Sequence, residues 1–443
     1  MAKKKMILQS VPLVAIDLGS DGVRAMAAEM TDEGLLRVLG VESSNKFPCV
    51  ERGVVTNPTN AGYIINETLK LLANRIRVDA LPSAFICVGG RTMQIASVSS
   101  KRDQVRKREV QQELLDEMEA ECRNKIETHN PDVAVLDLVP YYYTLDGKQQ
   151  DYAPTPTQQA MLVQAHFMAF VGKRDLEQKV HDSFARSGKR MEHMYVRPDA
   201  LLNALASDED MENGCVILDL GAQTTTITVY KGTQYLYNKV IPMGGYDITR
   251  DIEQIGISLS HAEQLKCKYG CACADMVEVN HRFRIPAPKM PSGEVALMAK
   301  DLANIISTRL DQMVMPLLDI LNKEADRFKV LYVTGGGSML NGVIEYLQSK
   351  TKISVMYGSH ASFLSGDTED EMCMPSYSSL IGTLLLGNIY RQSHPMPVKE
   401  DNMPILEMLK QMTLDFFTEQ QTNQNAKAEV KQENNKEKSL NLK

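Results

Sequence analysis

Two aspartates in this sequence each follow a short apolar run and precede a turn of small and hydroxyl residues. Asp17 follows residues 13–16 and Asp219 follows residues 215–218. A carboxylate beside a turn rich in N–H groups and hydroxyls can hold a hydrated Mg²⁺ and a phosphate chain. We therefore predict that Asp17 and Asp219 hold Mg²⁺ through water. The predicted phosphate-binding residues are Gly19, Ser20, Asp21, Gly221, Ala222, Gln223 and Thr224.

Each aspartate must be positioned by a hairpin, because a second β-branched or apolar run follows each turn, to residue 28 and to residue 230. Two such hairpins form a long-period internal repeat that can close on one nucleotide from both sides. A third segment, residues 330–342, reads as a strand, a glycine turn and a helix start, where a nucleoside can approach bare backbone. Any one of these segments is also compatible with an ordinary turn, but the three in this order favour a nucleotide site.

These motifs resemble the actin-like ATPase superfamily, in which two phosphate motifs and one adenosine motif come in this order. Within the superfamily the sequence resembles the FtsA family of bacterial cell-division proteins, also at residues 240–245, 262–272 and 377–382. The resemblance implies an α/β fold, the two-lobed actin-like ATPase fold with duplicated ribonuclease-H-like lobes. It also implies a small α+β subdomain inserted in the first lobe.

The expected domain boundaries follow from this resemblance and from the pattern of elements. The core of the first lobe is expected at residues 12–89, 171–212 and 376–392, with the inserted subdomain at 90–170. The core of the second lobe is expected at 213–243 and 300–375, with an outer subdomain at 244–299. Residues 393–443 are expected to form a linker, an amphipathic helix at about 404–418 and a polar, disordered tail.

Three local patterns give expectations about helices. Residues 101–127 are heavily charged with an apolar stripe from Val110 to Ile126, which is typical of a solvated helix face. Ser260 and Glu263 fit a capping box at the start of a helix. Residues 293–328 read as one long helical stretch, which Pro316 should kink or divide.

The resemblance also assigns a nucleoside site. In the family, a Glu and a Lys on one helix hold the nucleoside, and these map onto Glu263 and Lys266. The turn Gly335, Gly336 and Gly337 would line the nucleoside as well. A helix cap for Glu263 and a surface position for Lys266 remain the alternative.

Departures from the family pattern point to ATP and Mg²⁺ binding with slow or absent hydrolysis. The family's second motif usually runs Asp-x-Gly-Gly-Gly-Thr-x-Asp, whereas this chain has Ala222, Gln223 and Thr226 in place of two glycines and the second acid. Arg197 stands where many superfamily members have a Glu that helps to orient water, and an arginine cannot act as a base. No catalytic residue is assigned.

The segment at 404–418 has one apolar side, formed by Ile405, Met408, Leu409, Met412, Phe416 and Phe417. A linker, an apolar-faced helix and a polar tail suit a membrane-surface anchor, and FtsA ends with a similar helix. Here the polar face is not rich in Lys or Arg, and docking onto protein is the alternative. One short helix binds weakly, so a polymer that carries many copies would gain by multivalency.

Composition excludes several classes of protein. A formal net charge of −7, without a basic stripe, argues against nucleic acid as a partner. Eight cysteines without a C-x-x-C pattern, and no recognisable secretion signal, favour a reducing cytoplasm. Cys267, Cys271 and Cys273 are close in sequence, but small buried residues explain them better than a metal. No apolar run is long enough to span a bilayer.

The resemblance implies a cell-division protein that self-assembles on the inner membrane surface and tethers the tubulin-like protein FtsZ. FtsZ would bind the outer part of the second lobe near residues 244–291, and other division proteins the inserted subdomain. The location would be the cytoplasmic face of the membrane at the division site. The alternatives are a small-molecule kinase of the same superfamily and a rod-shape or pilus actin homologue.

Overall fold

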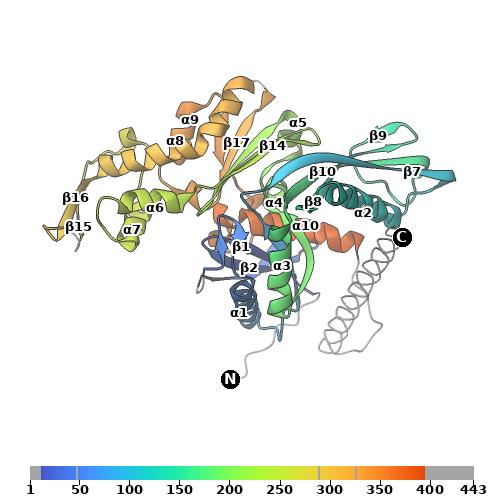
Figure 1. Cartoon of the computed structure of the whole chain (residues 1–443), viewed down its shortest axis with the longest axis horizontal. Helices are drawn as coiled ribbons and strands as arrows, with labels where there is room; N and C mark the ends of the chain where they lie inside the picture. Colours follow the sequence, from blue (N-terminus) through green and yellow to red (C-terminus); the bar gives the residue numbers. More distant parts are fainter. Residues whose placement is uncertain (1–10, 46–47, 288–289, 325–326, 395–443) are drawn as a thin grey trace, which may run out of the picture. The chain divides into compact units, whose positions relative to one another are not determined.

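The computed structural model describes residues 11–45, 48–287, 290–324 and 327–394. Its contacts separate a first unit, residues 1–390, from a second, residues 391–443. The predicted amphipathic helix at 404–418 lies outside the described residues. Within the described residues the fold is mixed α/β, with two five-stranded sheets and one four-stranded sheet (Figure 1).

The first five-stranded sheet has the order β11-β6-β1-β2-β3. Its strands are β1 (Leu13–Gly19), β2 (Gly22–Met30), β3 (Leu36–Ser44), β6 (Ser83–Val88) and β11 (Arg190–Val196). The predicted hairpin is confirmed, since β1 pairs antiparallel with β2. β1 also pairs in parallel with β6, with Asp17 beside Cys87, and β6 pairs in parallel with β11.

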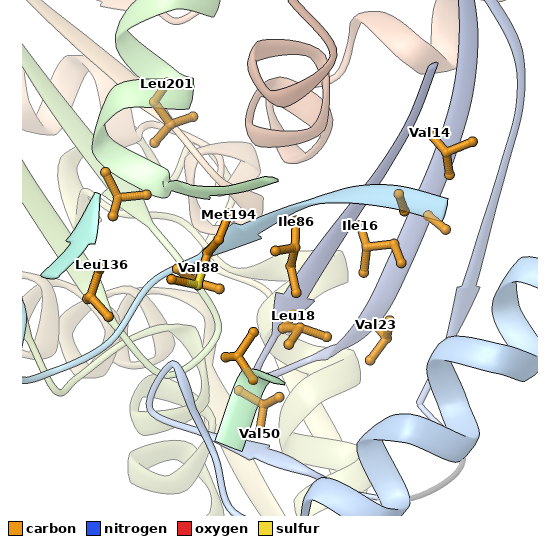
Figure 2. Close-up of a cluster of buried hydrophobic side chains, with 14 of the residues drawn as sticks. Val14, Ile16, Leu18, Val23, Val50, Ile86, Val88, Leu136, Met194 and Leu201 are labelled. Carbon is orange, nitrogen blue, oxygen red and sulfur yellow. The ribbon is translucent and has the colours of Figure 1, made fainter. Parts of the chain in front are cut away.

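Both faces of this sheet are covered, and the strands β1 and β6 at its centre are almost entirely buried. Val14, Ile16 and Leu18 belong to a core that includes apolar residues of α1 (Pro58–Ile76) and α3 (Arg174–Ser187). Figure 2 shows part of this core, with side chains of β1, β2 and β6 gathered together. Helices α1 and α3 lie side by side in Figure 1. Leu13 and Ala15 alternate to the opposite face, where they join a core with α10 (Ser378–Ser393).

The second five-stranded sheet has the order β14-β13-β12-β17-β18 and repeats this arrangement. Its strands are β12 (Cys215–Leu220), β13 (Thr225–Lys231), β14 (Gln234–Ile241), β17 (Val330–Thr334) and β18 (Ser354–Tyr357). The hairpin β12–β13 is again confirmed, and β17 pairs in parallel with β12, with Asp219 beside Thr334. Apolar residues of α8 (Ala299–Glu324) and α9 (Val343–Lys350) share one core with this sheet.

The four-stranded sheet has the order β7-β10-β8-β9 and packs against α2 (Gln112–His129). Its strands are β7 (Gln94–Glu109), β8 (Val133–Leu145), β9 (Lys148–Gln150) and β10 (Gln159–Lys173). The expectation of a helix from residue 101 is wrong, because residues 101–109 form the end of β7. The charges there belong to an exposed edge strand paired to β10. The apolar stripe belongs to α2 except for Val110, which precedes the helix, and Met118 and Cys122 of the stripe are buried.

The structure departs from three further expectations about helices. Residues 294–298 form β16 (Glu294–Met298) rather than helix, paired with β15 (Arg282–Pro286). Helix α8 then continues through Pro316 undivided, because its buried side chains, including Val314 and Leu317, hold it against the sheet. Ser258, not Ser260, caps α7 (Leu259–Tyr269): its side chain accepts a hydrogen bond from the His261 amide.

The remaining elements are short. They are β4 (Val50–Glu51), β5 (Val54–Val55), α4 (Arg197–Leu205), α5 (Asp208–Asn213), α6 (Gly245–Glu253), η1 (Ala274–Met276), η3 (Gly336–Met339), η4 (Ala361–Phe363), η5 (Asp370–Cys373) and η6 (Pro375–Tyr377). Among the described helices, none combines the length and apolar character needed to cross a membrane.

Candidate functional site

One cavity of about 830 Å³ is lined by the turns that follow β1, β12 and β17 and by residues of α4, α7 and α10. Every residue predicted from the sequence to bind phosphate, nucleoside or metal within the described chain lines it. These residues are Asp17, Gly19, Ser20, Asp21, Asp219, Gly221, Ala222, Gln223, Thr224, Glu263, Lys266, Gly335, Gly336 and Gly337. The structure therefore brings together residues that lie more than three hundred positions apart in the chain.

The start of α6 supports the turn after β12 through two backbone hydrogen bonds. The amide of Gly245 donates to the Gly221 carbonyl at 3.0 Å, and the amide of Tyr246 donates to the Ala222 carbonyl at 2.7 Å. A Cβ on Gly244 would lie 2.5 Å from the Gly221 oxygen, so only glycine fits there. The segment 240–245, quoted for its resemblance to FtsA, is thus the support of this turn.

Gln223 reaches from this turn to the other side of the cavity. Its Oε1 accepts a hydrogen bond at 3.0 Å from the amide of Arg52, between β4 and β5. Nearby, the amide of Gly53 donates to Ser20 Oγ at 3.0 Å, so the loop at 52–53 contacts both phosphate turns. The long side chain that departs from the family pattern therefore has a structural partner.

The three glycines after β17 are not equivalent. Gly335 has φ +81°, and a Cβ there would lie 2.3 Å from Asp219 Oδ1. A Cβ on Gly337 would lie 2.8 Å from the Cβ of Leu220. Gly336 has no atom within 4 Å of the place its Cβ would take. Gly335 and Gly337 thus pack on β12, whereas Gly336 presents open backbone in the cavity wall.

Glu263 and Lys266 form one network with α6. Lys266 Nζ lies 2.8 Å from Glu263 Oε2 and 2.9 Å from the Gly245 carbonyl, and Thr249 Oγ1 donates to Glu263. Burial opposes ionisation of Glu263, but hydrogen bonds from Lys266 and Thr249 outweigh it and lower its pKa. Glu263 is therefore a carboxylate held on the cavity wall, and the capping role is taken by Ser258.

Arg197 lies between the two aspartates. Its two terminal nitrogens donate to the two oxygens of Asp17, one of them at 3.1 Å, and its Nε is 3.8 Å from Asp219 Oδ2. Ser379 Oγ, on α10, donates to Asp17 Oδ2 at 3.0 Å. Asp17 and Asp219 are only 3% and 5% exposed.

This arrangement does not fit a hydrated Mg²⁺ held between Asp17 and Asp219. Mg²⁺ needs an octahedral shell whose waters donate to free carboxylate oxygens. Both oxygens of Asp17 already accept hydrogen bonds from Arg197. Burial raises the pKa of Asp219, an effect that Arg197 opposes and Asp17 reinforces. The guanidinium of Arg197 supplies the positive charge that we predicted from the sequence to come from Mg²⁺.

The comparable place beside the second sheet holds a neutral group. His360 follows β18 as Arg197 follows β11, and it is fully buried. Its ring nitrogens lie 3.0 Å from Ser378 Oγ and 2.7 Å from the Met372 carbonyl. Burial lowers the pKa of His360, which keeps the imidazole uncharged near neutral pH.

Sequence reasoning missed the contacts of Arg197 and the role of Ser379 altogether. Arg197 was noted only as a poor base, and its contact with Asp17 spans 180 positions in the chain. Ser379 lies within the family-specific segment 377–382, which was the available signal. The expectation of small buried residues holds for Cys271 alone, because Cys273 is half-buried and Cys267 is exposed. Among the described residues no group of three or more metal-ligating side chains occurs.

Comparison with known proteins agrees with the resemblance to FtsA that the sequence motifs indicated. A family model described as cell division protein FtsA matches residues 216–382. The chain is 26% identical over 345 residues to the cell division protein FtsA of Porphyromonas gingivalis, covering 76% of this chain and 70% of that protein. It is 24% identical over 423 residues to FtsA of Pseudomonas aeruginosa, covering 91% and 98%.

Solved structures share the fold at low sequence identity. A PilM–PilN type IV pilus biogenesis complex matches with a TM-score of 0.59 and 16% identity, covering 85% of this chain and 98% of that one. MreB 5 of Spiroplasma citri bound to AMPPNP matches with a TM-score of 0.54 and 11% identity, covering 87% and 99%. The chain is thus similar to the cell-division protein FtsA and has the two-lobed actin-like fold, as its motifs indicated.

Proposed function

We propose that this protein is an ATP-binding cell-division protein that assembles with itself on the inner membrane surface and tethers FtsZ there. The observation that carries the nucleotide part is the single cavity on which all the predicted phosphate and nucleoside residues converge. The solved relative MreB 5 of Spiroplasma citri, with AMPPNP bound, supports the same use of the fold. The similarity to FtsA supports the cell-division part.

Slow or absent hydrolysis is part of the proposal. Phosphoryl transfer to water needs a group that orients the nucleophile, commonly a carboxylate or an amide. Four acidic residues of the described chain line the cavity, and each has a cationic partner. Asp17 and Asp219 share Arg197, Asp21 pairs with Arg24 at 3.1 Å, and Glu263 pairs with Lys266. None of the four is left as an unpaired base.

The membrane and FtsZ parts rest on the resemblance and on the sequence of the tail. The domain boundaries predicted from the sequence are part of the same proposal. FtsZ would bind near residues 244–291 of the outer subdomain, and residues 90–170 would serve self-assembly and other division proteins. The apolar side at 404–418 would bind a lipid surface weakly, so a polymer would be needed to hold the protein there. The proposed location is the cytoplasmic face of the membrane at the division site.

The test is co-sedimentation with anionic liposomes and purified FtsZ, with and without ATP, for the full chain and for a chain truncated after Pro395. We expect the full chain to pellet with the liposomes and to bring FtsZ with it, and the truncated chain to stay in the supernatant with FtsZ. If both forms stay in the supernatant, the membrane tether is refuted.

The kinase alternative is tested with the same protein. ATP turnover is measured alone and with a panel of sugars and acetate. Our proposal predicts turnover far below the ~1–100 s⁻¹ typical of kinases, with no stimulation by any of these acceptors. Stimulated turnover in that range would replace the scaffold with an enzyme.

A further inference from the structure

We propose that Arg197 is a built-in counter-cation that replaces the divalent metal, so that this cavity binds the phosphate chain of a metal-free nucleotide. The inference rests on the proposed nucleotide binding and adds to it the ionic form of the ligand. It predicts a protein whose nucleotide affinity does not depend on Mg²⁺.

The order of the strands in the first sheet positions Arg197 beside Asp17. It is the first residue of α4, directly after β11, and β11 lies in parallel beside β6, which lies beside β1 and Asp17. The side chain passes close to the backbone just after β6, where a Cβ on Gly89 would lie 3.4 Å from Arg197 Nε without a clash. The guanidinium therefore reaches Asp17 from the start of α4, at the end of a strand of the same sheet.

The charges explain why the guanidinium stays there. Two buried carboxylates close together each raise the cost of ionising the other, and a cation between them removes that cost. A bidentate arginine–carboxylate pair is among the stronger charge-assisted contacts. Burial disfavours the charged guanidinium, but the field of Asp17, with those of Cys87 and Asp219, outweighs this and raises the pKa of Arg197. The cation is therefore permanent.

A divalent ion would have to compete with this pair for Asp17. Asp17 Oδ2 accepts from both Arg197 and Ser379, so a metal-bound water finds no free position on that atom without breaking a contact. Displacing the guanidinium would leave it beside the incoming metal, with like charges in one cavity. Retaining it leaves further N–H groups of the guanidinium, along with Arg24, to face phosphate oxygens.

Binding of a fluorescent ATP analogue to the full-length protein tests the proposal, measured once with excess EDTA and once with excess Mg²⁺. We expect the two dissociation constants of the wild-type protein to agree within about threefold, a difference of well under one decade in affinity. A wild-type protein that binds only with Mg²⁺ overturns the proposal while leaving nucleotide binding intact. A wild-type protein that binds in neither condition refutes the proposed function itself.

Variants at the same position sharpen the result. Arg197→Gln removes the cation, so we expect binding in EDTA to weaken by about tenfold or more and to recover with Mg²⁺ as Asp17 becomes free. Arg197→Lys keeps the charge and should remain independent of Mg²⁺. Arg106→Gln, an exposed position on β7, is the control for lost charge and should match the wild-type protein.

Equal binding in EDTA by Arg197→Gln and wild type overturns the proposal. If Arg197→Gln does not fold, the comparison of the wild-type protein with and without metal still decides it.

Discussion

At the residue scale, a substitution in the glycine turn after β17 can test nucleotide binding without changing the stability of the fold. Gly336→Ala adds a methyl group where no atom lies within 4 Å, so we expect the free energy of unfolding to change by less than about 0.5 kcal/mol. If a nucleoside approaches this backbone, the same methyl group should weaken nucleotide binding. Thermal unfolding and a nucleotide titration of one sample measure both effects.

Gly335→Ala is the matched control for that experiment. Its φ of +81° and a predicted Cβ distance of 2.3 Å to Asp219 Oδ1 make the substitution strained, with an expected cost of about 1–3 kcal/mol. A Gly336→Ala protein that binds nucleotide as tightly as wild type would mean that the ligand does not touch this turn.

A second residue-scale prediction concerns pH. Asp199 on α4 is buried and accepts a hydrogen bond from the Tyr235 hydroxyl at 2.6 Å. Burial, reinforced by Asp137, raises its pKa from 3.8 to about 7. The folded protein therefore holds this proton between about pH 4 and pH 7 where the unfolded chain has lost it, so this group makes stability fall as pH rises through that range.

The variant Asp199→Asn isolates that contribution. The amide keeps an oxygen for Tyr235 but does not titrate, so the variant should lack this part of the decline in unfolding free energy from pH 5 to pH 8. Urea unfolding at the two pH values gives the difference. Parallel declines in wild type and variant would show that Asp199 ionises in the folded protein as easily as in the unfolded chain.

At the element scale, the crossing of α10 over α4 places Ser379 beside Asp17. A Cβ on Gly382 would lie 1.8 Å from the Ala200 carbonyl oxygen, and this atom cannot move without distorting α4. We expect Gly382→Ala to lower the unfolding free energy by about 1–3 kcal/mol or more. Gly366→Ala, with nothing within 4 Å, is the control and should leave the melting temperature unchanged. Similar melting temperatures for both variants would mean that the crossing relaxes freely.

The elements also show what the sequence could predict. The hairpins after Asp17 and Asp219 and the glycine turn were predicted because alternation and turn residues are local signals. The end of β7 was not, because a charged edge strand and a charged helix face have the same composition, and pairing with β10 decides between them. Ser258 rather than Ser260 is the cap because α7 begins at Leu259, and sequence patterns do not fix the start of a helix to within two residues. The position of Arg197 depends on parallel pairing of three strands distant in sequence.

At the scale of the whole molecule, the contact between Gln223 and Arg52 joins the two halves of the repeat across the cavity. Gln223→Ala removes the acceptor of the Arg52 amide, so we expect the unfolding free energy to fall by about 0.5–1.5 kcal/mol. Gln223→Glu keeps an acceptor and should keep that stability, but its charge should weaken binding of a phosphate chain. Unfolding and nucleotide titration of the two variants separate these effects. Equal stability of Gln223→Ala and wild type would mean that water replaces the side chain.

The repeat has one consequence that concerns redundancy. Each half provides a strand, an aspartate and an outer strand, but the residue that follows the outer strand and contacts the aspartates is a cation, Arg197, in the first half. Its counterpart His360 has both ring nitrogens engaged away from the aspartates, with Ser378 and the Met372 carbonyl. Acidification therefore cannot recruit His360 as a substitute. Although the two halves repeat one arrangement, a substitution that removes the charge of Arg197 is therefore not compensated by His360 in the other half.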